Sequence, residues 1–273
     1  MSSILTNTSA MVALQTLKGV NASLAKAQDE ISTGKSVATA KDNAAVWAIS
    51  KVMESDVSGF KAVSESLSLG ESTVAVASAG AEQITKLLTQ MKEKVIAATG
   101  ENVDHTKIDA EVAELKNQIT SIISASQFNG ANLLNSAGGD ITVLSSLDRD
   151  GTTVTAANIT VASVDFEANL DLTDVDVTSA SAADTSLAAI EAHIQTAVEG
   201  AAALGASAKR ISYQSEFVGK VMDAMKAGIG TLVDADMEEA SARLQALQTQ
   251  QQLGIQSLSI ANQAPQNILS LFR

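Results

Sequence analysis

The sequence has 273 residues, no cysteine, a single proline and about 3% aromatic residues. Without cysteine, disulfides, thiol catalysis and cysteine-ligated zinc are excluded. Aromatic side chains normally supply much of the area of a core, so their scarcity indicates helices packed through aliphatic side chains. The one proline is Pro265, which leaves room for long uninterrupted helices before it.

Acidic residues outnumber basic ones by 31 to 18, and the net charge is −13. This balance argues against nucleic acid as a partner, because neutralising phosphates requires clustered lysine and arginine. No run of about 18 apolar residues exists, so no membrane-spanning helix and no membrane partner are predicted. The first residues carry neither a basic segment nor a sustained apolar run, so any export is expected to proceed without a cleavable secretory signal.

The charge is spread unevenly over five parts of the chain. Counted from the sequence, the net charge is +1 for 1–40, −4 for 41–135, −8 for 136–186, −1 for 187–234 and −1 for 235–273. The middle part is also rich in Thr, Ser and Val. The pattern predicts a solvated acidic part between two ends that are nearly neutral.

Both ends of the chain carry an apolar stripe with spacings of three and four residues. That spacing is typical of an amphipathic helix or a coiled-coil seam, and two such seams are most simply buried against each other, antiparallel. The first helix is expected to end at Gly34 as C-cap, and the last one before Pro265. The predicted assembly seam is Leu14, Leu17, Val20, Leu24 and Ile31 with Met237, Leu244, Leu247, Ile255 and Leu258.

Helical patterns also fill the chain between the first stripe and residue 127. Helices are predicted at 41–99 and 104–127, with Asp104 as the N-cap of the second. The helical pattern ends at Phe128-Asn129-Gly130, because Asn-Gly favours a tight turn.

The pattern then changes to the alternation that is typical of β-strands. Short β-branched runs at 141–144, 152–155 and 159–161 predict strands, and Asp150-Gly151 predicts a hairpin between the first two. One more strand is expected within 170–178. Each of these runs is short, so the sheet is expected to be small.

Helix is expected to return near residue 184, with Asp184 or Thr185 as N-cap, and to break or bend near Gly228-Ile229-Gly230. The predicted fold class is therefore mainly α. It consists of a long antiparallel helical or coiled-coil rod formed by the N- and C-terminal segments, with a small β-hairpin insertion in mid-chain.

No arrangement of residues points to catalysis, a cofactor or a metal. Gly34-Lys35-Ser36 resembles the end of a phosphate-binding loop, but residue 29 is aspartate where that motif requires glycine. Asp148-Arg149-Asp150-Gly151 resembles part of a calcium loop that lacks the final glutamate. There is no G-x-S-x-G motif, and His105 and His193 are expected to be solvated surface residues. We predict neither an enzyme nor a cofactor-binding protein.

Three strings are more specific. EISTGK and AKDNAA lie within 3–46, FNGANLL within 124–134, and ANQAPQNILSLFR closes 234–273. Together they closely resemble bacterial flagellin, in particular the short flagellins of alphaproteobacteria. The resemblance leaves out 138–185, which corresponds to the variable part of flagellins. The matching motif positions are Gly34, Asp42, Asn43, Phe128, Asn129, Gly130, Asn262, Gln263, Pro265 and Gln266.

The resemblance implies a secreted structural subunit that polymerises with copies of itself into the filament used for swimming. It implies that the arms 1–40 and 235–273 pair as the filament core, and that 41–135 and 187–234 form helical rods around it. The acidic insertion 136–186 is then expected to face outward.

The same resemblance implies partners other than the chain itself. They are the flagellar type III export apparatus, which carries the unfolded chain, an export chaperone, the hook-junction proteins and the cap protein. Flagellins recognised by the animal innate-immune receptor carry Arg and Leu at two positions where Gln90 and Lys94 stand here, while Glu114 keeps an acidic residue. Weak or absent recognition is therefore expected.

Four alternatives stay open from the sequence alone. A minor flagellin carries the same motifs, and a hook–filament junction protein shares the terminal helices. A chemoreceptor rod is a helical hairpin too, but its heptads run through a helical tip, where this chain has a β insertion. An enzyme requires a polar constellation that is not found.

Overall fold

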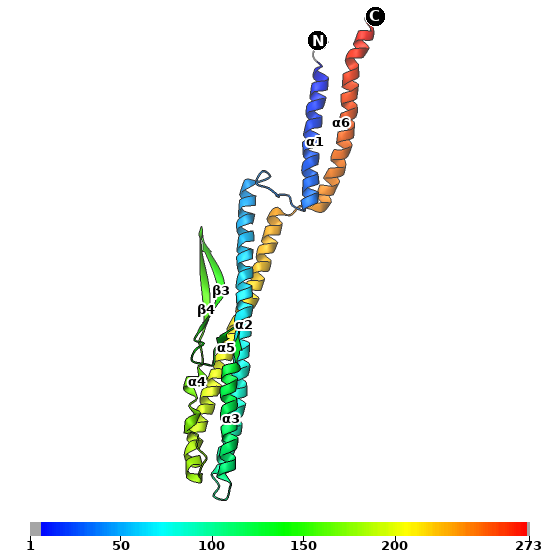
Figure 1. The fold of residues 1–273 in the computed structure, drawn as a ribbon. Helices are drawn as coiled ribbons and strands as arrows, with labels where there is room; N and C mark the ends of the chain where they lie inside the picture. The colour runs from blue at the N-terminus through cyan, green and yellow to red at the C-terminus, as the bar shows by residue number, and fades with distance from the viewer. Residues whose placement is uncertain (1–6, 272–273) are drawn as a thin grey trace. The chain divides into compact units, whose positions relative to one another are not determined.

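The computed structural model describes residues 7–271, and the side chains of residues 7–263. It confirms the predicted fold class, which is mainly α with a small β insertion in mid-chain (Figure 1). None of the described helices is long and apolar enough to cross a membrane. The elements are α1 (Thr8–Thr33), α2 (Ala44–Ala98), α3 (His105–Ala125), β1 (Gln127–Phe128), β2 (Ala131–Asn132), β3 (Ile141–Asp150), β4 (Thr153–Val161), α4 (Phe166–Asn169), the 3-10 helix η1 (Leu172–Asp174), α5 (Ala180–Val233) and α6 (Met237–Leu271).

The chain divides into two compact units. The first contains the described residues up to 55 together with those from 224 onward, and the second contains residues 56–223. Helices α2 and α5 contribute residues to both units.

In the first unit, α1 and α6 lie side by side and run antiparallel (Figure 1). The side chain of Asn7 caps α1 by accepting a hydrogen bond from the backbone N–H of Ala10 at 3.1 Å. Gly34, with φ of 69°, ends α1 in the left-handed conformation, as predicted. Asp236 caps α6 by accepting from the backbone N–H groups of Glu238 and Glu239 at 3.0 and 3.2 Å.

The second unit is built on α2, α3 and α5, which pack through aliphatic side chains. Asp104 caps α3, as predicted, by accepting from the backbone N–H of Lys107. Phe166 is the largest of the fully buried side chains, and the others are aliphatic or methionine, as the scarcity of aromatics predicts. The largest of them include Leu67, Ile84, Leu88 and Met91 on α2, Ile119 on α3, and Ile190, Leu204 and Ile211 on α5.

Two hairpins follow α3. Strands β1 and β2 are joined by Asn129 and Gly130, whose φ angles of 49° and 84° confirm the predicted tight turn. Strands β3 and β4 pair antiparallel on either side of Gly151, which has φ of 60°. The two separate runs predicted at 152–155 and 159–161 join into the single strand β4, because Ala156, Ala157 and Asn158 between them continue the ladder.

Glycines allow strand β3 to approach helix α2 closely. A Cβ atom at Gly59 would lie 2.5 Å from Leu147 Cδ1, and one at Gly70 would lie 2.5 Å from Val143 Cγ2. Val143 is buried at 3% exposure. One face of the hairpin is therefore packed against a helix, while most of β4 is exposed.

The strand expected within 170–178 is not there. Helix α4 and η1 lead into this segment, and carboxylates satisfy its backbone N–H groups locally, in competition with a ladder. Asp171 accepts from Thr173 N at 3.1 Å and Asp176 from Thr178 N at 2.9 Å. Buried Leu170, Val175 and Val177 fasten the segment to the helices.

Both histidines brace this same segment rather than lying in solvent. His193 is only 8% exposed, and its Nε2 lies 2.9 Å from Asp174 Oδ1, so the expectation of a solvated surface residue is wrong for it. His105 Nδ1 lies 3.1 Å from the carbonyl oxygen of Val177. Each imidazole ring thus supplies a hydrogen-bond partner to this segment: His105 to a backbone carbonyl and His193 to a carboxylate.

Three predicted helix boundaries are also wrong. Helix α5 begins at Ala180, before Asp184, because Ser179 Oγ accepts from Ala182 N at 3.2 Å and supplies the cap. It continues without a break through residues 228–230, since Gly228 packs closely against Met53 Cε. Packing there outweighs the low helix propensity of glycine.

Helix α6 continues past Pro265, where the sequence predicts its end. A proline has no N–H, so it leaves the carbonyl four residues earlier without its helical donor. That carbonyl belongs to Ala261, and it accepts a hydrogen bond from Asn7 Nδ2 at 2.7 Å. A neighbouring helix thus replaces the bond that the proline removes.

Candidate assembly surface

The facing sides of α1 and α6 follow a heptad pattern of small and aliphatic residues. Apart from the half-buried Glu30, their least exposed positions alternate in steps of three and four residues, which is the spacing of a coiled-coil seam. These positions are Ala10, Ala13, Leu17, Val20, Leu24, Ala27 and Ile31 on α1, and Ala240, Leu244, Leu247, Gln251, Gly254, Leu258 and Ala261 on α6.

Direct contacts establish the register of this pair. A Cβ atom at Gly254 would lie 3.1 Å from Leu17 Cδ1 and 4.0 Å from Leu17 Cβ, so Leu17 sits directly against the glycine. Gln251 Nε2 donates to Asn21 Oδ1 at 2.7 Å, one turn further along. Together with the bond from Asn7 to Ala261, these contacts place each heptad position of α1 opposite one of α6.

Seven of the ten predicted seam residues lie on these facing sides and are partly buried: Leu17, Val20, Leu24, Ile31, Leu244, Leu247 and Leu258. The other three are outside them. Leu14 is 44% exposed, Met237 43% and Ile255 54%. Leu14 and Ile255 are each offset by one residue from a heptad position, which turns the side chain by about 100° around the helix. Met237 is the first residue of α6.

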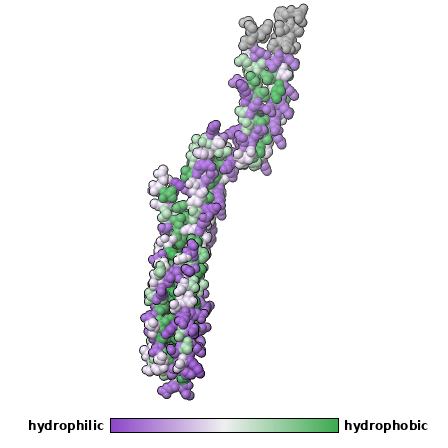
Figure 2. All heavy atoms as spheres, viewed as in Figure 1, coloured by the Kyte–Doolittle hydropathy of each residue, from purple (hydrophilic) through white to green (hydrophobic). Residues whose placement is uncertain are grey.

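Apolar side chains also cover the outer flanks of the pair. Met11 and Val12 are each 63% exposed, and Ile260 is 69% exposed. Figure 2 shows such hydrophobic atoms at the surface of α1 and α6, among hydrophilic ones. Met11, Val12 and Leu14 line a groove of about 400 Å³. The pair therefore presents apolar surface that the chain itself does not bury, as interaction surfaces do.

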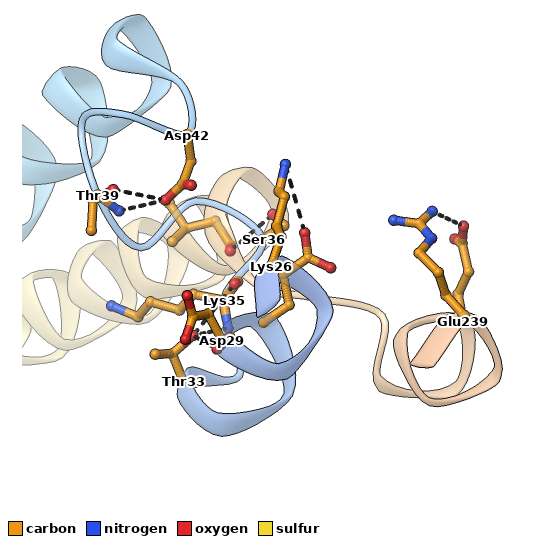
Figure 3. A network of polar contacts seen from close by, with 11 residues as sticks. Lys26, Asp29, Thr33, Lys35, Ser36, Thr39, Asp42 and Glu239 are labelled. Carbon is orange, nitrogen blue, oxygen red and sulfur yellow. Dashed lines mark hydrogen bonds and ion pairs between the residues drawn. The ribbon is translucent and has the colours of Figure 1, made fainter. Parts of the chain in front are cut away.

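The motif around Gly34 forms a two-stranded connection at the inner end of the pair. Ala235 N donates to the carbonyl of Gly34 at 2.9 Å, and Ser36 donates to the carbonyl of Val233 from its N–H at 2.8 Å and from its hydroxyl at 3.1 Å. Figure 3 shows Ser36 among the polar residues of this connection. The outgoing and returning chains are thus tied by backbone hydrogen bonds.

Asp42 and Asn43 shape the turn that leads into α2. Asp42 accepts from the backbone N–H of Thr39 at 2.8 Å and from its hydroxyl at 3.0 Å (Figure 3). These two bonds hold the pKa of Asp42 below its ordinary value, the backbone bond having the larger effect. Asn43 accepts from Val46 N at 3.2 Å and so caps the helix.

The motif FNGANLL has a structural role in the second unit. The turn at Asn129 and Gly130 directs the chain back, and Asn132 then lies buried at 4% exposure. Its Nδ2 donates to the carbonyl of Ile123 at 2.7 Å, while its Oδ1 accepts from Leu134 N at 2.8 Å. A buried amide with both ends satisfied fixes the connection after α3.

The closing motif is only partly described. Asn262 and Gln263 are exposed. The side chains of Pro265 and Gln266 lie outside the described residues. In the second unit, Gln90, Lys94 and Glu114 line one groove of about 570 Å³, and Lys94 forms an ion pair with Glu111 at 2.5 Å.

Among the described residues, no group of three or more His, Asp or Glu side chains is arranged to hold a metal ion. The polar contacts at the motifs cap helices, close turns and tie strands together. They hold the fold, and the surface left for interaction is apolar and helical.

Two family models match the chain. The bacterial flagellin N-terminal helical region matches residues 4–138, and the bacterial flagellin C-terminal helical region matches residues 187–272. These two ranges together cover most of the chain and leave out residues 139–186, nearly all of the acidic insertion.

Full-length relatives are similar as well. Flagellin FljK of Caulobacter vibrioides is 41% identical over 100% of this chain and 99% of its own length. A flagellin of Brucella melitensis is 43% identical over 100% of both chains. Among solved structures, that of Bacillus cereus flagellin is similar with a TM-score of 0.49 and 20% identity, over 55% of this chain and 86% of that chain.

Proposed function

The chain belongs to the bacterial flagellin family, and on that premise we propose how it acts as a structural subunit of the extracellular flagellar filament. The observation that carries the proposal is the α1–α6 pair, which closes one seam and leaves apolar flanks exposed. Polymerisation buries these flanks against other copies of the chain. Burial stabilises by about 1.5–3 kcal/mol for each large apolar side chain that is fully covered.

The contacts between copies are heterologous, so that a flank of one copy meets a different surface of the next. Repetition of a heterologous contact that does not close gives a helical polymer rather than a ring. We propose that 1–40 and 235–273 form the filament core, with Leu14, Met237 and Ile255 available for contacts between copies. We propose 41–135 and 187–234 as the helical layer around it.

The insertion 136–186 is proposed to face solvent with its acidic side. Its net charge of −8, counted from the sequence, opposes close approach of two insertions. The packing of Val143 at Gly70 supports this placement, because it covers the apolar face of the hairpin within one chain.

Further partners follow from the family resemblance alone. They are the type III export apparatus, which is proposed to carry the chain unfolded, an export chaperone, the hook-junction proteins and the cap protein. For the innate-immune receptor we propose weak or absent recognition, because Gln90 and Lys94 replace the expected Arg and Leu. A reporter-cell response at ordinary potency contradicts this.

Electron microscopy of cells that make this chain as their sole filament protein tests the function. We expect long filaments. A minor flagellin gives filaments only together with another subunit, and a hook–filament junction protein gives no long filament. Either result contradicts the role of main subunit.

A further inference from the structure

The structure contains an unusual pairing between a proline in one helix and an asparagine at the start of another. Helix α6 includes Pro265, which supplies no N–H to the carbonyl of Ala261. The carbonyl of Ala261 therefore lacks the donor that residue 265 of a regular helix supplies.

The side-chain amide of Asn7 bonds to the carbonyl of Ala261 with one end and caps α1 with the other. Its Nδ2 donates to the carbonyl of Ala261 at 2.7 Å, while its Oδ1 accepts from Ala10 N at 3.1 Å. Aspartate or serine would cap α1 equally well. Aspartate has no donor for the carbonyl, and serine is too short to make both contacts. The cap and the bond between the helices together therefore require asparagine.

The alanine and leucine positions of the seam specify the register only weakly. Alanine and leucine recur along both helices, so a slip of one heptad would again place apolar residues opposite each other. After such a slip Asn7 would face the carbonyl of Gly254, which already receives the N–H of Leu258 within the helix. The carbonyl of Ala261 would be left without a donor. The slipped state thus loses a hydrogen bond that the observed state makes.

We propose that Asn7 is a positioning residue, which sets the register of α1 against α6 through the carbonyl that Pro265 leaves free. This rests on the proposed function, because the paired helices are the proposed filament core. The contacts of Leu17 with Gly254 and of Asn21 with Gln251 act in the same register. A subunit with a slipped pair presents displaced flanks and does not fit its neighbours.

The absence of cysteine makes the register measurable with engineered disulfides. The double variant Leu17→Cys with Gly254→Cys reports the observed register, because the two Cβ positions lie 4.0 Å apart there and a disulfide can form. The double variant Leu17→Cys with Leu247→Cys reports a slip of one heptad, because these two residues lie opposite each other only in the slipped state. Full-length subunits are oxidised in filaments with copper–phenanthroline, and bonds within one chain are separated from bonds between chains by their mobility on non-reducing gels.

Asn7→Ser, which keeps the cap, is expected to lower the ratio of in-register to slipped disulfide by about tenfold, the equivalent of one lost hydrogen bond. Asn7→Asp, which keeps the shape but lacks the donor, is expected to act in the same direction. Ser9→Ala, exposed on the same turn of α1, is the matched control and should leave the ratio unchanged.

The decisive comparison is made with Pro265→Ala, which restores an N–H for the carbonyl of Ala261. In that background Asn7→Ser is expected to change the ratio by less than about twofold. Equal effects of Asn7→Ser with and without Pro265→Ala, or no effect in the parent, overturn the proposal. Electron microscopy reads assembly separately: a parent chain without filaments contradicts the proposed function, whereas filaments with an unchanged ratio contradict only the register.

Discussion

At the scale of single residues, short carboxylate side chains hold the segments that are neither helix nor sheet. Asp42, Asp171 and Asp176 each accept hydrogen bonds from the backbone N–H and the hydroxyl of one threonine, which lies two or three residues away. These hydrogen bonds to the charged form lower the pKa of each carboxyl. The segments they close are consequently more stable when the carboxylates are ionised.

Stability is therefore expected to fall in acid. A group with a lowered folded pKa stabilises the fold above its unfolded pKa, near 4, and this stabilisation is lost as the pH falls through the folded pKa. For Asp176 the main cause is the backbone N–H of Thr178. Asp176→Asn keeps an acceptor that does not titrate, so the melting temperature should decline less steeply between about pH 5 and pH 3. Glu82→Gln, exposed on α2, is the control for the loss of one negative charge. If the melting temperature of Asp176→Asn declines with pH as steeply as that of the parent, the proposed role of Asp176 is contradicted.

Single charges in the seam are expected to abolish assembly. Leu17→Asp and Leu247→Asp each place an unpaired carboxylate on the facing sides of α1 and α6, where its desolvation is unfavourable. The amount of polymer that sediments should drop at least about tenfold, since a few kcal/mol is involved. Gln28→Asp, exposed on α1 outside the groove at Met11, Val12 and Leu14, is the matched control. Normal polymer from either seam variant would exclude burial of these residues in the filament.

At the scale of elements, glycines decide where the β insertion rests. A side chain at Gly70 would collide with Val143, and one at Gly200 would collide with Phe166. Strand β3 is also held by the ion pair between Arg149 and Asp56, which raises the pKa of Arg149 through the hydrogen bond. A hairpin of two strands is marginal by itself, so this docking is what keeps it ordered.

Substituting two helical glycines should consequently have opposite effects. Gly70→Ala forces the hairpin away from α2 and is expected to destabilise by about 1–3 kcal/mol, as overpacking does. Gly219→Ala on α5 meets no atom within 4 Å, so it should stabilise by about 0.4–1 kcal/mol. Urea unfolding of the full chain measures both. Equal changes in the free energy of unfolding at the two positions would show that helix propensity, and not contact with the hairpin, determines the effect of Gly70→Ala.

At the scale of the whole molecule, the two ends of the chain depend on each other. Removing 235–273 takes away α6 and uncovers the apolar side of α1. We expect the shortened protein to be soluble and helical, because the core of the second unit is retained, but unable to polymerise. Electron microscopy and circular dichroism test this. Normal filaments from the shortened chain would refute pairing of the two ends as the basis of assembly.

The ends are also expected to gain helix on assembly. A two-helix pair with exposed apolar flanks buries little area for each residue that it orders, so neighbouring copies are needed to complete its burial. The helicity per residue, measured by circular dichroism, should be higher in filaments than in monomer. Equal values in the two states would contradict coupled folding and assembly.

The sequence by itself determined the helices, the turns at Gly34 and Asn129-Gly130, and the hairpin at Gly151, because these depend on local periodicity and on residues suited to positive φ. It also carried the family motifs. It did not determine which apolar residues face the partner helix: Leu14 and Ile255 belong to the stripes in the sequence but lie on the flanks.

Only the tertiary structure decided the remaining features, because each depends on contacts distant in sequence. Local patterning predicted a strand at 170–178, but Asp171 and Asp176 close turns there, and the buried side chains of Leu170, Val175 and Val177 hold the segment in place. Pro265 was expected to stop α6, and the helix continues because Asn7, at the other end of the chain, supplies the missing donor to its backbone. A hydrogen bond between the two ends of a chain leaves no trace in the local pattern of either.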